Sequence, residues 1–235
     1  NNNNNNNNNS NHFTHGLILP RAARYLSSAI SDGSVKFRSA VSLLRDCAEA
    51  LQHLHSRGLT HGALLPSSIV QRKDERWVLM NLASSSRFEE PVHGNMFLGC
   101  KPPEEYRAMR RVGNDDEREL GLDRAPAATA TRDVWAFGLV AFEVLTRRSL
   151  FRCDPTGNLA SEGEALRVGN WALHNCLGAL QELDFELEVR QIGLRDRLLA
   201  TDLVSSLLHP NSKHRPTSFR EVLRPDLLTK EKPTS

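Results

Sequence analysis

The run Val134-Trp-Ala-Phe-Gly-Leu-Val-Ala-Phe-Glu-Val-Leu145 carries a single charge, at Glu143. A helix over these positions is apolar around its whole circumference, and such a helix must be buried on all sides. The run therefore predicts a central helix that is surrounded by other helices. Asp133 comes directly before it, at a position expected for the N-cap.

Amphipathic segments elsewhere predict the surrounding helices. From Phe37 to about His55, apolar residues recur at steps of three and four, which places them on one face of a helix. The same reasoning predicts a helix over Leu194–Leu208, a short helix over Arg21–Ile30 and a last helix over Pro216–Leu223 with proline in its first turn.

Strand signals are few. Gly16–Leu19 is a short apolar run ended by proline, and it predicts a strand that leaves a sheet. Ser68–Gln71 and Trp77–Met80 flank a polar turn and predict a small β-hairpin. The fold class expected from these patterns is therefore mainly α, as an α+β protein with a small β-hairpin.

Low-complexity and irregular segments suggest the domain limits. Asn1–Asn9 is a homopolymer with nothing apolar to bury, so residues 1–12 are expected to be a disordered tail. One domain is predicted over residues 13–228, followed by a tail over 229–235. Within it, residues 83–101 are expected to be a loop and residues 110–131 a flexible insertion.

Composition excludes several classes of protein. A formal net charge of +2 gives no basis for nucleic-acid binding, and no run is long and apolar enough for a membrane span. No leader-like segment opens the chain. The four cysteines form no CxxC pair and predict free thiols and no metal site, with a Cys153–Cys176 disulfide as the alternative.

Five motifs, in order, resemble the C-terminal lobe of a protein kinase. Leu17–Leu19 is similar to the strand that enters the hinge, and His55–His61 is similar to the approach to the catalytic loop. The other three motifs are Pro102-Pro103-Glu104, Asp133-Val-Trp-Ala-Phe-Gly138 and His214-Arg215-Pro216-Thr217, which resemble the APE, DxWxxG and arginine-proline motifs. The resemblance implies a kinase-like C-terminal lobe. No Gly-rich phosphate loop or strand lysine precedes Leu17, so an N-terminal lobe is expected to be absent from this chain.

The catalytic positions depart from the family pattern. His61-Gly62-Ala63 stands where kinases have His-Arg-Asp, so an alanine replaces the aspartate that orients the substrate hydroxyl. Leu65 and Ser68 stand in place of the phosphate-contacting lysine and the metal-binding asparagine. Asn81 replaces the aspartate that holds magnesium, and so the negative charge is lost.

Residues of the family's framework are kept. The resemblance implies that Asp133 holds the catalytic-loop backbone and that Glu104 and Arg215 form a buried ion pair. His61 is expected to be structural, with metal binding or general base catalysis as the alternatives. Ser84–Ser86 is expected to be an ordinary loop, with phosphorylation as the alternative, and Arg110-Arg111 is expected to be solvated surface.

These observations predict a pseudokinase that acts as a scaffold or allosteric partner, with no cofactor. Its partner is expected to be a protein: the missing N-terminal lobe, a second copy or another chain. The resemblance to secreted rhoptry-type pseudokinases is slight, so a cytoplasmic location is the default. The alternative is a divergent serine/threonine kinase that uses magnesium and ATP with an N-lobe from a longer protein. A truncated gene product without a role of its own is the third interpretation.

Overall fold

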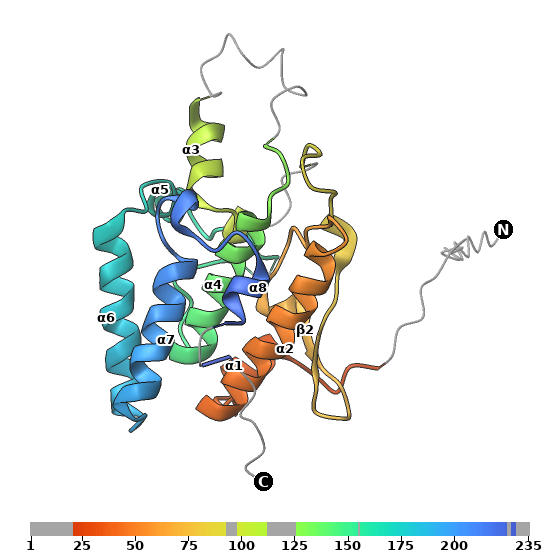
Figure 1. Ribbon diagram of the computed structural model, residues 1–235. Helices are drawn as coiled ribbons and strands as arrows, with labels where there is room; N and C mark the ends of the chain where they lie inside the picture. Colours follow the sequence, from red (N-terminus) through yellow and green to blue (C-terminus); the bar gives the residue numbers. More distant parts are fainter. Residues whose placement is uncertain (1–20, 93–97, 112–125, 155, 225–226, 229–235) are drawn as a thin grey trace, which may run out of the picture.

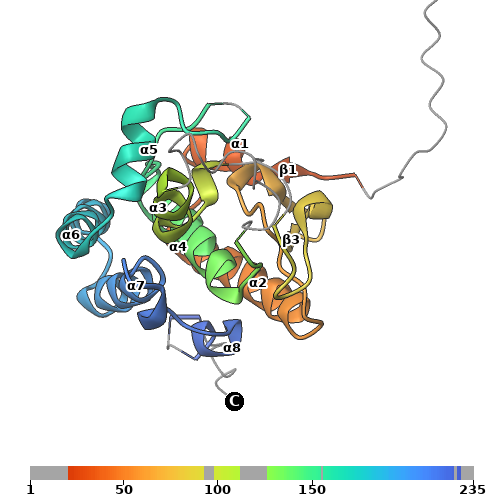
Figure 2. The same cartoon turned by 90° about the horizontal axis from the view of Figure 1, so that it is seen from above.

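The computed structural model describes residues 21–92, 98–111, 126–154, 156–224 and 227–228. These residues form eight α-helices and one three-stranded sheet, with the helices packed around α4 (Figures 1 and 2). The helices are α1 Leu26–Ser31, α2 Phe37–His55, α3 Pro103–Arg111, α4 Ala130–Thr146, α5 Glu162–Gly169, α6 Leu173–Val189, α7 Leu194–Leu207 and α8 Phe219–Val222.

The prediction of a buried central helix is confirmed. Helix α4 contacts α2, α6 and α7, and nearly all its residues from Arg132 to Thr146 are buried. The prediction that Asp133 is the N-cap is wrong, because α4 begins one turn earlier and Thr129 is the capping residue. The reason is tertiary: the Asp133 carboxylate bonds to a distant loop and is not available to cap its own helix.

Helix predictions from apolar spacing succeeded where one face is buried. The helix over Phe37–His55 is confirmed, and α7 ends one residue before the predicted Leu208. The helix predicted from Arg21 begins only at Leu26, because Arg24–Tyr25 pair with another strand. Helix α8 begins at Phe219 and not at Pro216, because the N–H of Thr217 donates to the Glu221 carboxylate and turns the chain into the helix there.

Three helices were not predicted. Helix α3 starts at Pro103 and ends at Arg111, so it takes in the first two residues of the insertion that is predicted over 110–131. Helix α5 is capped by Ser161, whose hydroxyl accepts from the N–H of Glu164. Helix α6 pairs with α7 as a helical hairpin along one edge of the molecule (Figures 1 and 2).

The sheet has one strand more than the predicted hairpin. Strands β2 (Ile69–Gln71) and β3 (Trp77–Leu79) are antiparallel, with Val70 opposite Val78. Strand β1 (Arg24–Tyr25) adds to the other edge of β2, with Tyr25 opposite Val70. Two residues are too few to show strand periodicity, so local sequence could not indicate β1.

Several predicted segments lie outside the described residues. These are the tails over 1–12 and 229–235, the strand Gly16–Leu19, most of the insertion over 110–131 and the side chains of Arg110-Arg111. The loop predicted over 83–101 contains only two 3-10 turns in its described part, at Leu82–Ser84 and Leu98–Cys100. In the described regions, no helix combines the length and apolar character that a membrane span needs. All four cysteines are free, so the alternative Cys153–Cys176 disulfide is wrong.

Candidate functional site

The loop His61-Gly62-Ala63 is held from beneath by Asp133 of α4. The Asp133 carboxylate accepts from the backbone N–H of His61 at 2.7 Å and from that of Gly62 at 3.0 Å. His55 Nε2, at the end of α2, lies 2.9 Å from the same carboxylate. Because Asp133 is buried, these donors replace water around its charge and fix the loop on the central helix.

The His61 side chain is built into the protein interior. Its Nε2 donates to the carbonyl of Met80 at 3.0 Å, and its Nδ1 faces the N–H of Ala63 at 3.4 Å. Burial lowers the pKa of His61 although the nearby Asp133 acts in the opposite direction. The ring is therefore neutral at pH 7 and completely shielded from solvent.

Gly62 allows a second segment to close against this loop. Its φ is +78°, and a Cβ at this position would lie 2.2 Å from the carbonyl oxygen of Ser84. The same two segments are joined by a backbone hydrogen bond from the N–H of Thr60 to the carbonyl of Ser86, and the Thr60 hydroxyl also bonds to the backbone of Ser86. An arginine, the residue of the family pattern, has no space here without a shift of the segment after Asn81.

None of the replaced positions in the loop offers a group to a substrate. The methyl group of Ala63 is buried, with 1% of the residue exposed. Leu65 is partly buried against the core. The Ser68 hydroxyl accepts from the N–H of Leu65 at 3.0 Å and donates to the carbonyl of Leu65 at 2.8 Å, so its bonding capacity is used locally.

Among the four positions where a catalytic residue of the family is replaced, Asn81 is the exposed one. Its φ of +63° places it in the left-handed region, which asparagine tolerates better than most residues. The next residue, Leu82, is 48% exposed. The hydroxyl oxygens of Ser84 and Ser85 are buried without hydrogen-bond partners, so in this conformation neither is open to a modifying enzyme.

Glu104 and Arg215 form a bidentate ion pair. Arg215 Nη1 and Nη2 lie 2.8 and 3.0 Å from the two carboxylate oxygens of Glu104. The guanidinium also covers the ring of Trp135, and its Nε donates to the carbonyl of His209. The Arg215 side chain is fully buried, whereas that of Glu104 is 34% exposed.

A neighbouring group of buried charges was missed in the sequence. Lys101, Glu105 and Arg132 are all buried, and Arg132 Nε lies 3.5 Å from Glu105 Oε1. Burial raises the pKa of Glu105 and lowers the pKa of Lys101. Glu105 Oε2 and Arg132 Nη1 have no hydrogen-bond partner in the described structure. Lys101 and Glu105 are far from Arg132 in the sequence, so no local sequence pattern could indicate that these charged side chains lie together.

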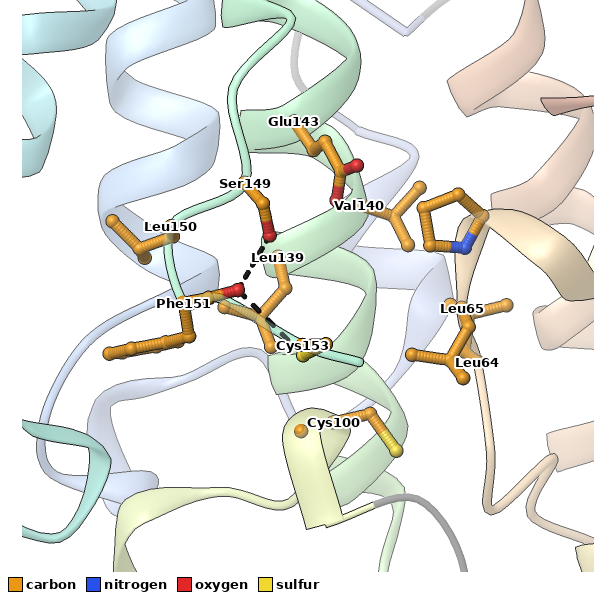
Figure 3. Close-up of a pocket in the computed structure, with 12 residues that line it drawn as sticks. Leu64, Leu65, Cys100, Leu139, Val140, Glu143, Ser149, Leu150, Phe151 and Cys153 are labelled. Atoms are coloured by element: carbon orange, nitrogen blue, oxygen red, sulfur yellow. Dashed lines mark hydrogen bonds between the residues drawn. The ribbon is translucent and has the colours of Figure 1, made fainter. Parts of the chain in front are cut away.

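A small cavity lies beside the loop, between Leu64–Pro66 and α4 (Figure 3). Its volume is about 30 Å³, and its walls include Leu139, Glu143 and Cys100. Burial raises the pKa of Glu143 to about 7. No described residue forms a hydrogen bond or ion pair with this carboxylate.

A larger groove runs between α2 and β3 and reaches the exposed Leu82. Its volume is about 330 Å³. The β3 side is apolar, with Trp77 and Leu79, and the α2 side carries Asp46 and Glu49. Asp46 already accepts from the N–H of Trp77 at 3.0 Å.

Comparison with known proteins assigns the fold. The sequence model of the protein kinase domain matches residues 11–228, which is most of the chain. The chain belongs to the protein kinase domain family. In this kinase domain, Ala63, Leu65 and Ser68 lie on one loop, and Asn81 follows Met80, whose N–H donates to the carbonyl of Ser68. Glu104 and Arg215 form a separate ion pair.

Relatives of this kinase domain are distant. The chain is 23% identical over 200 residues to the inhibitor of nuclear factor kappa-B kinase subunit beta of Rattus norvegicus, which covers 85% of this chain and 22% of that protein. It is 27% identical over 121 residues to a probable inactive receptor kinase of Arabidopsis thaliana, covering 49% of this chain and 10% of the relative. The kinase domain thus spans a minor part of the relatives it matches.

The residues present do not fit a magnesium–nucleotide. Magnesium binding relies on carboxylates, and the amide of Asn81 carries no charge. The Ser68 hydroxyl is bonded to Leu65, and Ala63 has no polar atom in its side chain. In the described parts of the chain, no three His, Cys, Asp or Glu residues gather closely enough for a metal ion.

Proposed function

We propose that this kinase domain is a pseudokinase whose role is to bind a protein partner as a scaffold or allosteric component. The observation that carries the proposal is the loop geometry: Ala63 is buried and Gly62 is closed over by Ser84. A general base at this position contributes roughly 10²–10⁴ to the rate of such a reaction. Neither Ala63 nor a neighbour at the same loop replaces that group.

The preserved framework supports a folded and non-catalytic role. The bonds from Asp133 to the loop and from Arg215 to Glu104 are complete, although the positions for chemistry carry apolar or neutral residues. A sequence drifting without selection would be expected to lose both kinds of residue. The domain therefore serves a purpose that needs its shape.

Leu82 and the groove beside it are the proposed contact surface for the partner. Leu82 is one of two large apolar side chains exposed outside α6 and α7 in the described residues, the other being Tyr25. An apolar side chain next to an open groove is stabilised when a partner covers it. An N-terminal kinase lobe or another protein chain would meet this requirement.

The experiment is a phosphotransfer assay with radiolabelled ATP and magnesium, using a generic protein substrate and the chain itself. We expect incorporation equal to that of a mock preparation. The matched control is Asn81→Ala, which removes the one exposed polar side chain of the site. Incorporation above background that this control abolishes would refute the proposal and favour the alternative, a divergent serine/threonine kinase.

A further inference from the structure

Two cysteine thiols lie at the small cavity beside the loop. Cys100 ends the 3-10 turn Leu98–Cys100 that precedes α3, and Cys153 follows α4 in the chain. Both side chains line the same cavity of about 30 Å³ (Figure 3). Cys47 and Cys176, which are also described, do not line it. The fold therefore brings one particular pair of cysteines together from distant parts of the sequence.

The sulfur of Cys153 packs against the backbone next to Cys100. A Cβ atom added to Gly99 would lie 2.5 Å from the Cys153 Sγ, a distance at which one of the two atoms must move. Glycine at position 99 therefore leaves the space that this sulfur fills. Consecutive Cα atoms are about 3.8 Å apart, so the backbone of Cys100 is only one residue farther along.

Backbone hydrogen bonds hold the two segments in this arrangement. Cys153 lies in a short hairpin, in which the N–H of Asp154 donates to the carbonyl of Asn158 at 2.7 Å. The N–H of Gly99 donates to the carbonyl of Gly157 in the same hairpin at 3.2 Å. Because the segments are already joined, a covalent link between them would cost little further chain entropy in the folded state.

The two thiols differ in their access to solvent. Cys153 lies at the surface, whereas Cys100 is 2% exposed. Burial raises the pKa of Cys153 to about 11 and that of Cys100 to about 12. Burial also raises the pKa of the Tyr106 hydroxyl, and both thiols add to this effect, so the three groups lie within electrostatic range of one another. Since the thiolate is the reacting form, the pair is expected to oxidise slowly at pH 7.

We propose that Cys100 and Cys153 form a reversible disulfide that links the turn before α3 to the hairpin after α4. A disulfide requires Cα atoms about 4.4–6.8 Å apart, and the cavity between the two side chains gives Cys100 space to change its rotamer. The inference does not depend on the proposed function, because neither thiol is at a replaced catalytic position.

Oxidised glutathione can act as the oxidant in two exchange steps. The exposed Cys153 thiolate attacks one glutathione sulfur, which forms a mixed disulfide and releases one glutathione thiolate. The Cys100 thiolate then attacks the Cys153 Sγ and releases the second glutathione thiolate. The two protons of the protein thiols end on the two glutathione molecules, so the chain loses two electrons and the oxidant gains them. Dithiothreitol reverses both steps.

The first test is oxidation of the whole chain by oxidised glutathione at pH 8, followed by peptide mapping without a reducing agent. We expect a chain lighter by two hydrogen atoms, with the peptides of Cys100 and Cys153 joined. Cys100→Ser should abolish the link and leave glutathione on Cys153. The matched control Cys176→Ala, at a cysteine outside the cavity, should keep the link. An unreacted chain, or wild type that carries only glutathione on Cys153, would overturn the proposal.

The second test is the melting temperature of the oxidised chain. A disulfide restricts the unfolded chain, so the linked form is expected to melt roughly 5–10 °C above the reduced form. Dithiothreitol should remove this difference. Cys153→Ser, a substitution at the surface, should fold and show no rise after the same oxidation. A linked chain that melts at or below the temperature of the reduced chain would show that the fold does not bring the two thiols together.

Discussion

Arg215 shows how much one residue contributes when it is buried. Its guanidinium joins Glu104, the ring of Trp135 and the carbonyl of His209, and so ties α3, α4 and the segment after α7 together. Glu143, farther along α4, is the opposite case: its carboxyl group is partly buried and has no hydrogen-bond or ion-pair partner among the described residues. Arg215 is therefore expected to affect the total stability of the fold, and Glu143 the way in which stability depends on pH.

Arg215→Ala is expected to lower the free energy of unfolding by about 2–4 kcal/mol, because it removes the hydrogen bonds that the buried guanidinium makes to Glu104 and to the carbonyl of His209, whereas Glu104 is partly exposed and can be solvated. This is a large part of the 5–15 kcal/mol available to a whole domain. Urea denaturation measures it. The control is Arg72→Ala, which removes an exposed ion pair with Asp74 and should cost less than about 1 kcal/mol. Equal midpoints for both variants would contradict the structure.

Glu143→Gln is expected to change how stability depends on pH. The pKa of Glu143 is raised by burial to about 7 in the folded chain, from an ordinary 4.5. Its protonated form is therefore stabilised by folding, so this contribution is present below pH 4.5 and is lost as pH rises through about 7. At pH 8 the variant should be more stable than wild type by roughly 2–3 kcal/mol, and at pH 5 the difference should be much smaller. Thermal melts at both pH values measure this, and a constant difference would contradict it.

At the scale of elements, close contacts between segments set the shape of the site. The loop 60–62 lies against the segment 84–86, and α3 lies near the start of α4 through Glu105 and Arg132. Neither contact involves residues that are neighbours in the sequence. Each of the two contacts can be tested with a substitution and a matched control variant.

Gly62→Ala is expected to cost several kcal/mol, because the new Cβ meets the carbonyl of Ser84 in addition to the strain of a positive φ. Gly58→Ala is the matched control: its φ is +69°, and nothing lies within 4 Å of an added Cβ. That variant should cost only about 1–2 kcal/mol, the price of the left-handed conformation. Chemical denaturation compares the two, and similar costs would show that the segment 84–86 does not close over the loop.

The buried pair between α3 and α4 should respond differently to single and double replacement. Glu105→Leu alone leaves Arg132 as an uncompensated buried charge and should cost about 3–5 kcal/mol. Glu105→Leu with Arg132→Met removes both charges and should recover most of that loss or exceed wild type. The melting temperatures of wild type, the single variant and the double variant measure this. A double variant that is less stable than Glu105→Leu would contradict the contact between the two side chains.

At the largest scale, the described residues form a helical lobe whose site has neither a carboxylate nor a free hydroxyl at the replaced positions Ala63, Leu65, Ser68 and Asn81. A ligand present at 100 times its dissociation constant would add about 2.7 kcal/mol to stability. We therefore expect millimolar magnesium–ATP to leave the melting temperature unchanged within a degree. The control is sodium ATP with a chelator, which tests binding without metal. A saturable shift that requires magnesium would contradict the account of Asn81 and Ser68.

The sequence alone determined the family and the helical class, because both rest on local patterns. The apolar run in α4, the one-sided spacing in α2 and α7 and the order of the motifs can all be recognised without knowing what they touch. Helix α6 escaped detection because its apolar residues lie on two sides, four facing the core and four facing solvent. The sequence of α6 therefore lacks the one-sided apolar spacing by which an amphipathic helix is recognised.

Tertiary structure decided the details of the site. Its position predicted Asp133 as the cap of its own helix and the resemblance implied that it holds the catalytic-loop backbone; the structure decides between the two, because its carboxylate bonds to backbone groups 71 and 72 residues away. The sequence shows only that Gly62 stands where the family has arginine, whereas the structure shows that the approach of Ser84 leaves no space for a side chain. The buried charges of Lys101, Glu105 and Arg132 were not predicted from the sequence at all. Contacts of this kind depend on how distant segments pack, and local sequence patterns carry no information about that packing.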